Sequence, residues 1–465
     1  MKKSGAFLFG TAVVLVASFV FGTGAFLPRQ VLADFDCLTL SPGASSEQRQ
    51  YCQNQVNQLE AELKELNNQL AQQKNQSGSL AGDIKVLQTK IAAKTAEIKS
   101  KNIKISQLSD SISEKKASIV SLSEKIETQK ESLAQLIRKT NEMDFTTTSH
   151  FLLSGDTLSD FYEDVSRYDT LKSKVKSSVD SINTIKGVTE QKKTELEKEQ
   201  DKAVDEKQNL IQVQKGIQQD QATQKQLLAI SKNKEAQYQK VIAEQQAKVA
   251  QIKSKLFSLA GGSQSIRFDV ALQYANEASQ KTGIDPAFLL AELTQESNLG
   301  SNVGKCYISD TSSGRGVNVN SGKTYTNVMK PSRDIPPFLE ITSKLGFDPL
   351  KTVVSCPIAG VAGYGGAMGP AQFIPSTWKL FENRLQADLG HYPNPWFAED
   401  AFMAAALYLA DLGAVGTSAS AQLRASCKYY GSGGKTCSYG RSVQNLKVGI
   451  QADIDYLNQY GVSRR

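Results

Sequence analysis

The strongest constraint on this chain is a long heptad repeat in a region without proline. No proline occurs over residues 46–264, and one apolar register runs through residues 56–133. Its a positions are Val56, Leu63, Leu70, Ser77, Ile84, Ile91, Ile98, Ile105, Ile112, Ile119, Ile126 and Leu133. A period of about 3.5 residues kept over this distance predicts a supercoiled helix rather than a helix of a globular core. The d positions include Lys94, Lys101 and Lys115, so we expect a narrow and partly hydrated seam.

The heptad pattern stops in an aromatic-rich segment near residues 144–170, and a weaker helical pattern then continues to about Leu256. Because the two arms have similar lengths, we expect an antiparallel coiled-coil hairpin over residues 46–257 with the aromatic segment at its tip. The arrangement, with an LLSG sequence followed by aromatic residues, resembles the coiled coils of bacterial division-associated murein hydrolases and their activators. That resemblance implies a membrane-embedded division regulator as a partner. The heptads alone are equally compatible with an inert spacer or a dimerisation rod.

The remainder of the chain divides by composition. Residues 34–45 form a short N-terminal segment, and Gly261 and Gly262 predict a hinge over residues 258–265. Proline and glycine become more frequent after it, and residues 266–465 are long enough for one compact domain. Amphipathic and alanine-rich helical patterns dominate there. We therefore expect an all-α fold: a coiled-coil hairpin followed by a mainly α-helical domain.

The N-terminus has the pattern of a targeting segment. Lys2 and Lys3 precede an uncharged, mostly apolar run over residues 6–27, and small residues precede Asp34. This predicts a signal peptide over residues 1–33. The apolar run is also long enough to remain as a membrane anchor. In both interpretations the lysines stay inside, and the rest of the chain lies outside the cytoplasm.

The six cysteines agree with such an oxidising location. They fall as sequence neighbours: Cys37 and Cys52, Cys306 and Cys356, Cys427 and Cys437. Six cysteines allow many connectivities, so pairing of neighbours is a hypothesis. A bridge between the second pair would join the ends of an insertion, residues 305–357, that is rich in Ser, Gly, Asn and Thr. The insertion is either a lid or wall of a binding site, or only an extended loop.

Several classes of function are not expected. A net charge of +7 over 465 residues is too small to favour nucleic acid as a partner. There are two histidines, His150 and His391, and neither an HExxH motif nor a pair of CxxC motifs. The GxxxxGK[ST] loop of nucleotide-binding proteins is absent from the sequence as well. We therefore expect neither a metal nor a cofactor.

Glu296 is the first candidate for catalysis. It lies at the end of the apolar helical sequence PAFLLAELTQES, just before the helix-stopping Gly300. A carboxyl group beside apolar residues is partly desolvated, which raises its pKa toward that of a general acid. Taken alone, such a glutamate is more often a solvated surface residue.

A glycine-rich segment supplies the second candidate site. The sequence GYGGAMGPAQFIPSTW spans residues 363–378. Its glycines allow the backbone to approach a ligand closely. Its aromatic, thioether and amide side chains suit an N-acetylated sugar: Tyr364, Met368, Gln372 and Phe373.

These motifs together resemble the lytic murein transglycosylases, particularly the membrane-bound B type. That family has a Glu-Ser/Thr-x-x-Gly motif, a GAMG-x-x-QF-x-PS loop, an alanine-rich helix and a tyrosine motif. Here they correspond to ESNLG at residues 296–300, the loop at 363–378, residues 398–413, and Tyr429-Tyr430-Gly431. The family usually has Tyr-Asn in the last motif, whereas this chain has two tyrosines and no asparagine there, so either tyrosine is a candidate for that position.

The resemblance implies a lysozyme-like fold for residues 266–465 and a role for each motif. Glu296 is expected to be the catalytic acid and base, with Ser297 orienting it. The substrate is expected to be the peptidoglycan glycan strand, cleaved between N-acetylmuramic acid and N-acetylglucosamine with formation of a 1,6-anhydro ring. The tyrosines at 429 and 430 join the loop side chains as candidates for binding the substrate.

Two alternatives remain open from the sequence. A lysozyme-type muramidase would use water, and it normally needs a second carboxylate. Conceivable second carboxylates are Asp310, Asp334, Glu340, Glu399 and Asp400. A glycan-binding scaffold that activates other hydrolases would need no catalytic glutamate.

Overall fold

The computed structural model describes residues 35–40, 44–73, 79–144, 158–230, 235–254, 256–258, 265–299, 304–358, 360, 363–434 and 436–461. The chain divides into two units, Met1–Asp36 and Cys37–Arg465. Only Phe35 and Asp36 of the first unit are described, so the predicted signal peptide or anchor lies outside the described residues. Within those ranges, no helix is both long and apolar enough to cross a membrane.

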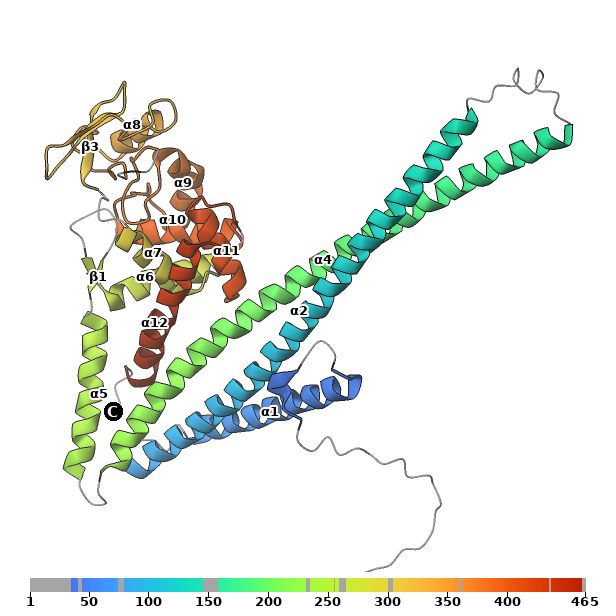
Figure 1. Ribbon diagram of the computed structural model, residues 1–465. Helices are drawn as coiled ribbons and strands as arrows, with labels where there is room; N and C mark the ends of the chain where they lie inside the picture. The colour runs from blue at the N-terminus through green and yellow to red at the C-terminus, as the bar shows by residue number, and fades with distance from the viewer. Residues whose placement is uncertain are drawn as a thin grey trace, which may run out of the picture. The chain divides into compact units, whose positions relative to one another are not determined.

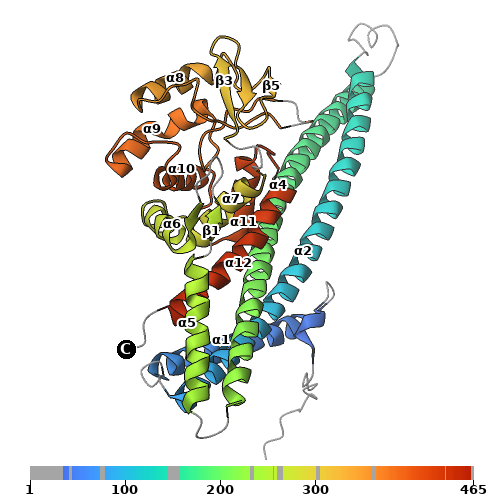
Figure 2. The same cartoon turned by 90° about the vertical axis from the view of Figure 1, so that its left-hand side faces the viewer.

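The N-terminal half of the second unit is built from long helices. A short 3-10 helix, Cys37–Thr39, is followed by α1 (Ser46–Gln73), α2 (Leu80–Asp144), α4 (Leu158–Leu228) and α5 (Glu235–Ser254). Helices α2 and α4 run side by side over much of their length (Figures 1 and 2). They are antiparallel, because successive lysines of α2 pair with successively earlier acidic residues of α4: Lys94 with Asp220, Lys101 with Glu206, and Lys115 with Glu195. The predicted hairpin is confirmed in this respect, and its seam is polar where these lysines lie.

The first arm is not one continuous helix, contrary to the heptad prediction. Helix α1 ends at Gln73, and α2 begins at Leu80. The two pack antiparallel, with Arg49 of α1 pairing with Asp110 of α2 at 3.1 Å, and Glu60 with Lys104. The backbone N–H of Gly82 donates to the hydroxyl of Ser79 at 3.1 Å, so a serine caps the start of α2.

This third helix changes which residues of α2 are buried. The predicted a positions of α2, such as Ile98 and Ile105, are only half-buried. The buried residues include Ala93, Ala96 and Ile103, which follow a different stripe. Because α4 and α1 both pack on α2, the residues between their two contact faces lose most of their exposure.

The second arm is also interrupted. Helix α4 ends at Leu228, and the separate helix α5 begins at Glu235. A small buried cluster joins α5 to both long helices: Leu87, Leu227, Tyr238 and Val241. The Tyr238 hydroxyl donates to the buried Asp83 carboxylate at 2.5 Å. The predicted single arm is therefore two helices. Much of the predicted tip, residues 145–157, lies outside the described residues.

The C-terminal region is mainly α-helical, as predicted. A strand pair, β1 (Leu256–Ser258) and β2 (Ser265–Arg267), flanks the predicted hinge, whose Gly261 and Gly262 lie outside the described residues. The helices are α6 (Phe268–Thr282), α7 (Pro286–Leu299), α8 (Ile335–Lys344), α9 (Pro375–Leu389), α10 (Ala398–Asp411), α11 (Ala419–Tyr429) and α12 (Ser438–Tyr460).

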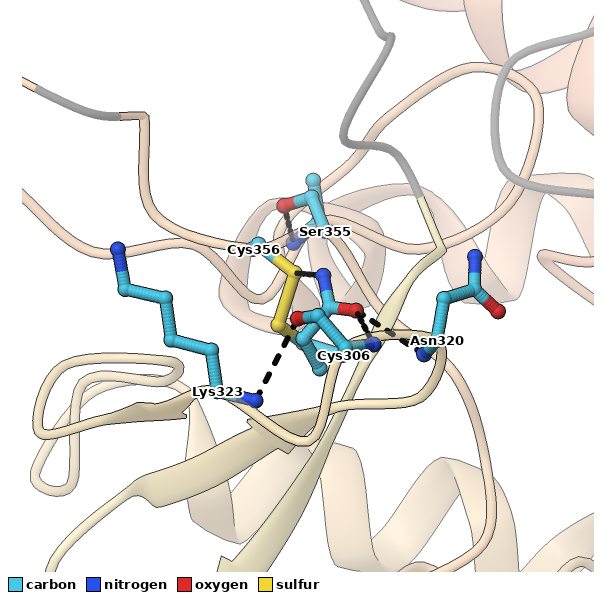
Figure 3. The surroundings of a disulfide bond; sticks show 8 residues. Cys306, Asn320, Lys323, Ser355 and Cys356 are labelled. Carbon is cyan, nitrogen blue, oxygen red and sulfur yellow. Dashed lines mark hydrogen bonds between the residues drawn. A yellow bond between two sulfur atoms is a disulfide. The ribbon is translucent and has the colours of Figure 1, made fainter.

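The insertion at 305–357 contains structure that the sequence did not indicate. It forms an antiparallel sheet of β3 (Cys306–Asp310), β4 (Arg315–Asn318) and β5 (Thr324–Tyr325), followed by α8. The sheet and α8 lie side by side in both views (Figures 1 and 2). The Cys306–Cys356 disulfide joins β3 to the segment that leads into the glycine-rich loop (Figure 3). The backbones of Cys306 and Val354 exchange two hydrogen bonds beside it.

All three disulfides join sequence neighbours: Cys37–Cys52, Cys306–Cys356 and Cys427–Cys437. This is the pairing expected from their order. Because disulfides persist in oxidising compartments, they indicate that the folded chain resides outside the cytoplasm.

Helix α7 lies at the centre of the C-terminal core. Its residues Phe288, Leu289, Leu290 and Leu293 are 0% exposed. Consecutive apolar residues cover all sides of its first turns, and such a segment is stable only in an interior. Helices α6, α10 and α12 pack against it. The two glutamates of α7 are therefore carried on a rigid, buried element.

Candidate active site

Two glutamates on α7, Glu292 and Glu296, lie one helical turn apart and therefore on one face. Glu292 is 0% exposed, whereas Glu296 is partly exposed. Burial is the main cause that raises the pKa of the Glu292 carboxyl to about 8, against hydrogen bonds that lower it. Burial likewise raises the pKa of Glu296, and a hydrogen bond from Tyr439 opposes that rise.

A tyrosine from another helix joins these carboxyl groups. The Tyr439 hydroxyl, in the first turn of α12, lies 2.6 Å from Oε1 of Glu296 and 2.8 Å from Oε1 of Glu292. On the other side, the Ser426 hydroxyl of α11 donates to Oε2 of Glu292 at 2.6 Å. Burial and the two carboxylates raise the pKa of Tyr439 far above its usual value, so its proton stays on the phenol.

Close packing of α11 and α12 places Tyr439 in this position. Gly440 follows it, and a Cβ atom there would lie 2.8 Å from the Leu423 side chain and 2.9 Å from Cys427 Sγ. The glycine thus allows α12 to approach α11 closely. The Cys427–Cys437 disulfide also joins the end of α11 to the start of α12.

The two tyrosines of the tyrosine motif, Tyr429 and Tyr430, have different surroundings. The buried hydroxyl of Tyr429 donates to the carbonyl of Ala371 at 2.7 Å, so this residue holds the glycine-rich loop. Tyr430 is 58% exposed, and its ring stacks on Tyr439 with centroids 4.8 Å apart. Tyr430 is therefore the member of the pair that offers an accessible ring beside the carboxyl groups.

The candidates in the glycine-rich loop are not equivalent. Met368 and Phe373 are buried in the core, and their backbones pair, N–H to carbonyl, at 2.9 Å. Gln372 adopts a left-handed φ of 54°, and its amide donates to the carbonyl of Gly369 at 2.6 Å. Tyr364 is 47% exposed. Of the four, Tyr364 has the most accessible side chain, whereas the others shape the loop.

Gly369 explains why the loop needs glycine. Its φ is 57°, and a Cβ atom would lie 1.7 Å from the carbonyl oxygen of Pro395. No other residue fits this contact without a backbone shift. The loop is thereby held against the segment that precedes α10.

The other carboxylates considered from the sequence have different surroundings. Asp310 accepts hydrogen bonds from Ser312 and Ser313, and these lower its pKa. Asp334 accepts a hydrogen bond from Ser376, and Asp400 is hydrogen-bonded to His391. Glu340 pairs with two lysines, and Glu399 is exposed.

The sequence did not single out Glu292, Tyr439 or Ser426. The one available signal was the four-residue spacing of Glu292 and Glu296 within an apolar helix. Ser297 belongs to α7, but its side chain lies outside the described residues.

A cavity of about 630 Å³ lies elsewhere, lined by residues of α1, α2 and α4, and none of the predicted site residues lines it. Among the described residues, no group of three or more His, Cys, Asp or Glu side chains is placed to hold a metal ion.

A raised pKa and partial exposure suit Glu296 for proton transfer. Such a carboxyl remains protonated at higher pH than a solvated glutamate, so it can donate a proton to a bound ligand. Once ionised, it can take a proton back. Glu292 lacks the exposure for direct contact with a ligand.

Comparison with protein families gives a match over residues 190–436, described as Transglycosylase SLT domain. The match begins within α4, includes Glu296 and the glycine-rich loop, and ends before Cys437. No curated protein and no solved structure matches the chain. Because the matched residues make up more than half of the 465, the chain belongs to the transglycosylase SLT domain family.

Proposed function

We propose that this protein is a peptidoglycan lytic transglycosylase with Glu296 as its single catalytic carboxyl group. The observation that carries the proposal is the environment of Glu296, a partly exposed carboxyl with a raised pKa at the end of a buried helix. Family membership supports peptidoglycan as the substrate. The bond cleaved is the β-1,4 bond between N-acetylmuramic acid and N-acetylglucosamine.

The reaction needs one group that acts first as an acid and then as a base. Glu296 donates its proton to the glycosidic oxygen, and the bond from that oxygen to the anomeric carbon of N-acetylmuramic acid breaks. The 6-hydroxyl of the same sugar then attacks the anomeric carbon while Glu296 takes its proton. The products are a free 4-hydroxyl on N-acetylglucosamine and a 1,6-anhydro ring. No water is consumed, and the carboxyl is regenerated.

The position of Glu292 supports an internal nucleophile. Inverting and retaining glycosidases place a second carboxylate beside the scissile bond. Glu292 lies close to Glu296, but it is 0% exposed and bonded to Ser426 and Tyr439. It is therefore unsuited to activate water or to attack a sugar.

The exposed aromatic residues are the proposed sugar contacts. Tyr430 and Tyr364 present accessible rings, and aromatic faces pack well against the apolar faces of sugars. Gln372 is held by its own loop, so we assign it a role in loop shape. Met368 and Phe373 support the loop from the core.

The experiment compares the full-length protein with Glu296→Gln on purified peptidoglycan, with mass analysis of the products. The amide is nearly isosteric but cannot donate and recover the proton, so activity should fall by about 10³-fold or more. Glu399→Gln, which changes an exposed carboxylate, is the matched control and should retain activity. Wild-type products should be lighter by one water than muramidase products and lack a reducing end. Reducing ends in proportion to bonds cut would make the protein a hydrolase.

The cellular setting is part of the same proposal. The enzyme acts in cell-wall remodelling or division, carried to the wall by its N-terminal segment, and its coiled coil binds a membrane-embedded division regulator. Support comes from the antiparallel α2–α4 pair and from the disulfides. Crosslinking of the intact protein in cells, with and without residues 80–228, tests the coiled coil as the binding element. An unchanged crosslinked partner after deletion would contradict it.

A further inference from the structure

The hydrogen bonds around Tyr439 require one proton more than the tyrosine can supply. Its oxygen lies within hydrogen-bond distance of a carboxyl oxygen on each side, 2.8 Å to Glu292 and 2.6 Å to Glu296. A phenol has a single proton to donate. If both carboxyl groups were ionised, one of them would face the phenol oxygen with no proton between them. One carboxyl group must therefore be neutral and donate to Tyr439.

Glu292 is the group better placed to be neutral. It is 0% exposed, and ionisation in such a site is costly unless a positive charge compensates it. The groups that act on its pKa are Ser426, Tyr439 and Glu296, none of which is positively charged, and burial raises that pKa to about 8. Its Oε2 accepts from Ser426, which leaves Oε1 to carry the proton toward Tyr439.

A neutral Glu292 fixes the direction of the tyrosine proton. If Oε1 of Glu292 donates to the Tyr439 oxygen, the Tyr439 hydroxyl must donate to Oε1 of Glu296. That oxygen of Glu296 is then occupied as an acceptor, whether the carboxyl is protonated or ionised. The catalytic proton is confined to the other oxygen, Oε2.

We infer that Glu292 is a positioning residue of the active site, whose neutral carboxyl directs the Tyr439 hydroxyl to Oε1 of Glu296 and so leaves Oε2 to transfer the proton. The inference rests on the proposed role of Glu296. Glu292 does not touch the substrate, and it acts on the reaction only through Tyr439. The glutamate, the tyrosine and Ser426 come from three different helices.

The titratable groups around Glu292 make the inference measurable. They are Glu296 on α7, Tyr439 on α12 and Tyr429 on α11, with Tyr408 packed behind Tyr429. The tyrosines have raised pKa values and stay neutral. As the pH rises, ionisation of Glu296 abolishes activity, and ionisation of Glu292 lowers kcat in addition because the donor to Tyr439 is lost. The alkaline limb of the wild-type protein should therefore be steeper than a single titration.

The test compares Glu292→Gln with Glu292→Met in the full-length protein, using soluble uncrosslinked glycan strands as the substrate. Glutamine can donate its amide to Tyr439 and accept from Ser426, so it imitates the neutral acid. It should retain kcat within about 3-fold, and its alkaline limb should fall with a slope of one proton. Methionine has a similar size but no donor, and it should lower kcat by about 10-fold with KM unchanged. Circular dichroism verifies that both variants are folded.

Three results would overturn the inference: a wild-type kcat for folded Glu292→Met, an equal loss of kcat in both variants, or a two-proton slope in Glu292→Gln. A two-proton slope in Glu292→Gln would overturn the inference even if Glu292→Met does not fold. Failure of the proposed function would give other results: wild-type protein would make reducing ends, or Glu296→Gln would remain active.

Discussion

Replacing Tyr439 with phenylalanine tests how the site holds Glu296. The change removes one hydroxyl group and keeps the ring, so the stacking on Tyr430 remains. Both carboxyl groups then lose a hydrogen-bond partner at 2.6 and 2.8 Å. Because Tyr439 is 5% exposed and does not face the solvent, substrate binding should be little affected.

The magnitude follows from the hydrogen bond to Glu296. A hydrogen bond to a charged group contributes about 1.5–3 kcal/mol, and its loss at the proton-transfer step corresponds to roughly 10- to 100-fold in rate. We therefore expect kcat to fall by that factor with KM unchanged. The same hydrogen bond lowers the pKa of Glu296. Its removal raises that pKa further, so Glu296 stays protonated longer and the alkaline limb moves to higher pH.

Tyr392→Phe is the matched control for stability. Tyr392 also donates to a buried glutamate, Glu382, at 2.9 Å, on another part of the same domain. Both variants should lose about 1–3 kcal/mol of unfolding free energy. Only Tyr439→Phe should lose activity.

The assay measures initial rates on soluble glycan strands from acid to alkaline pH, with thermal unfolding followed by circular dichroism. A folded Tyr439→Phe with wild-type kcat and an unshifted alkaline limb would refute the assigned role of this hydroxyl. Equal losses of activity in the two variants would show that the effect is one of general stability.

Two further substitutions test the glycine-rich loop and the packing of the long helices. Gly369→Ala should lower kcat by about 10²-fold, because its methyl group meets the carbonyl of Pro395 and displaces the loop. Gly390 also has a left-handed φ, of 78°, but open space around it, so an equal effect of Gly390→Ala on kcat would contradict the steric argument. Ile103→Asn should destabilise the packed helices α1, α2 and α4 by about 2 kcal/mol or more in chemical denaturation, because Ile103 is 5% exposed. Ile126→Asn, at a half-buried a position, should cost less, and the reverse order would mean that the heptad stripe is the core after all.

Much of the local structure could be predicted because it depends on neighbouring residues. The heptad period and the absence of proline predicted long helices, and α2 and α4 are 65 and 71 residues long. The apolar run before Glu296 predicted a helix, which is α7. The cysteine order predicted the disulfides. In each case the signal is a spacing along the chain.

Packing of distant segments was not predictable in the same way. The chain reverses between α1 and α2, although a formal heptad register continues across the interruption, because a register states which residues share a face but not which helix covers it. The β3–β4–β5 sheet was missed as well. Its strands are two to five residues long, too short for a reliable alternation signal.

The same distinction between local sequence and distant packing holds for the candidate site. The sequence by itself determined that a glutamate ends an apolar helix and that a glycine-rich loop follows it. Only the tertiary structure decided that Glu292 is fully buried and that Ser426 and Tyr439, 134 and 147 residues further along the chain, bond to it. The physical reason is that desolvation and hydrogen bonding depend on which atoms surround a carboxyl group in space. Those atoms come from α11 and α12, and no spacing along the chain places those helices against α7.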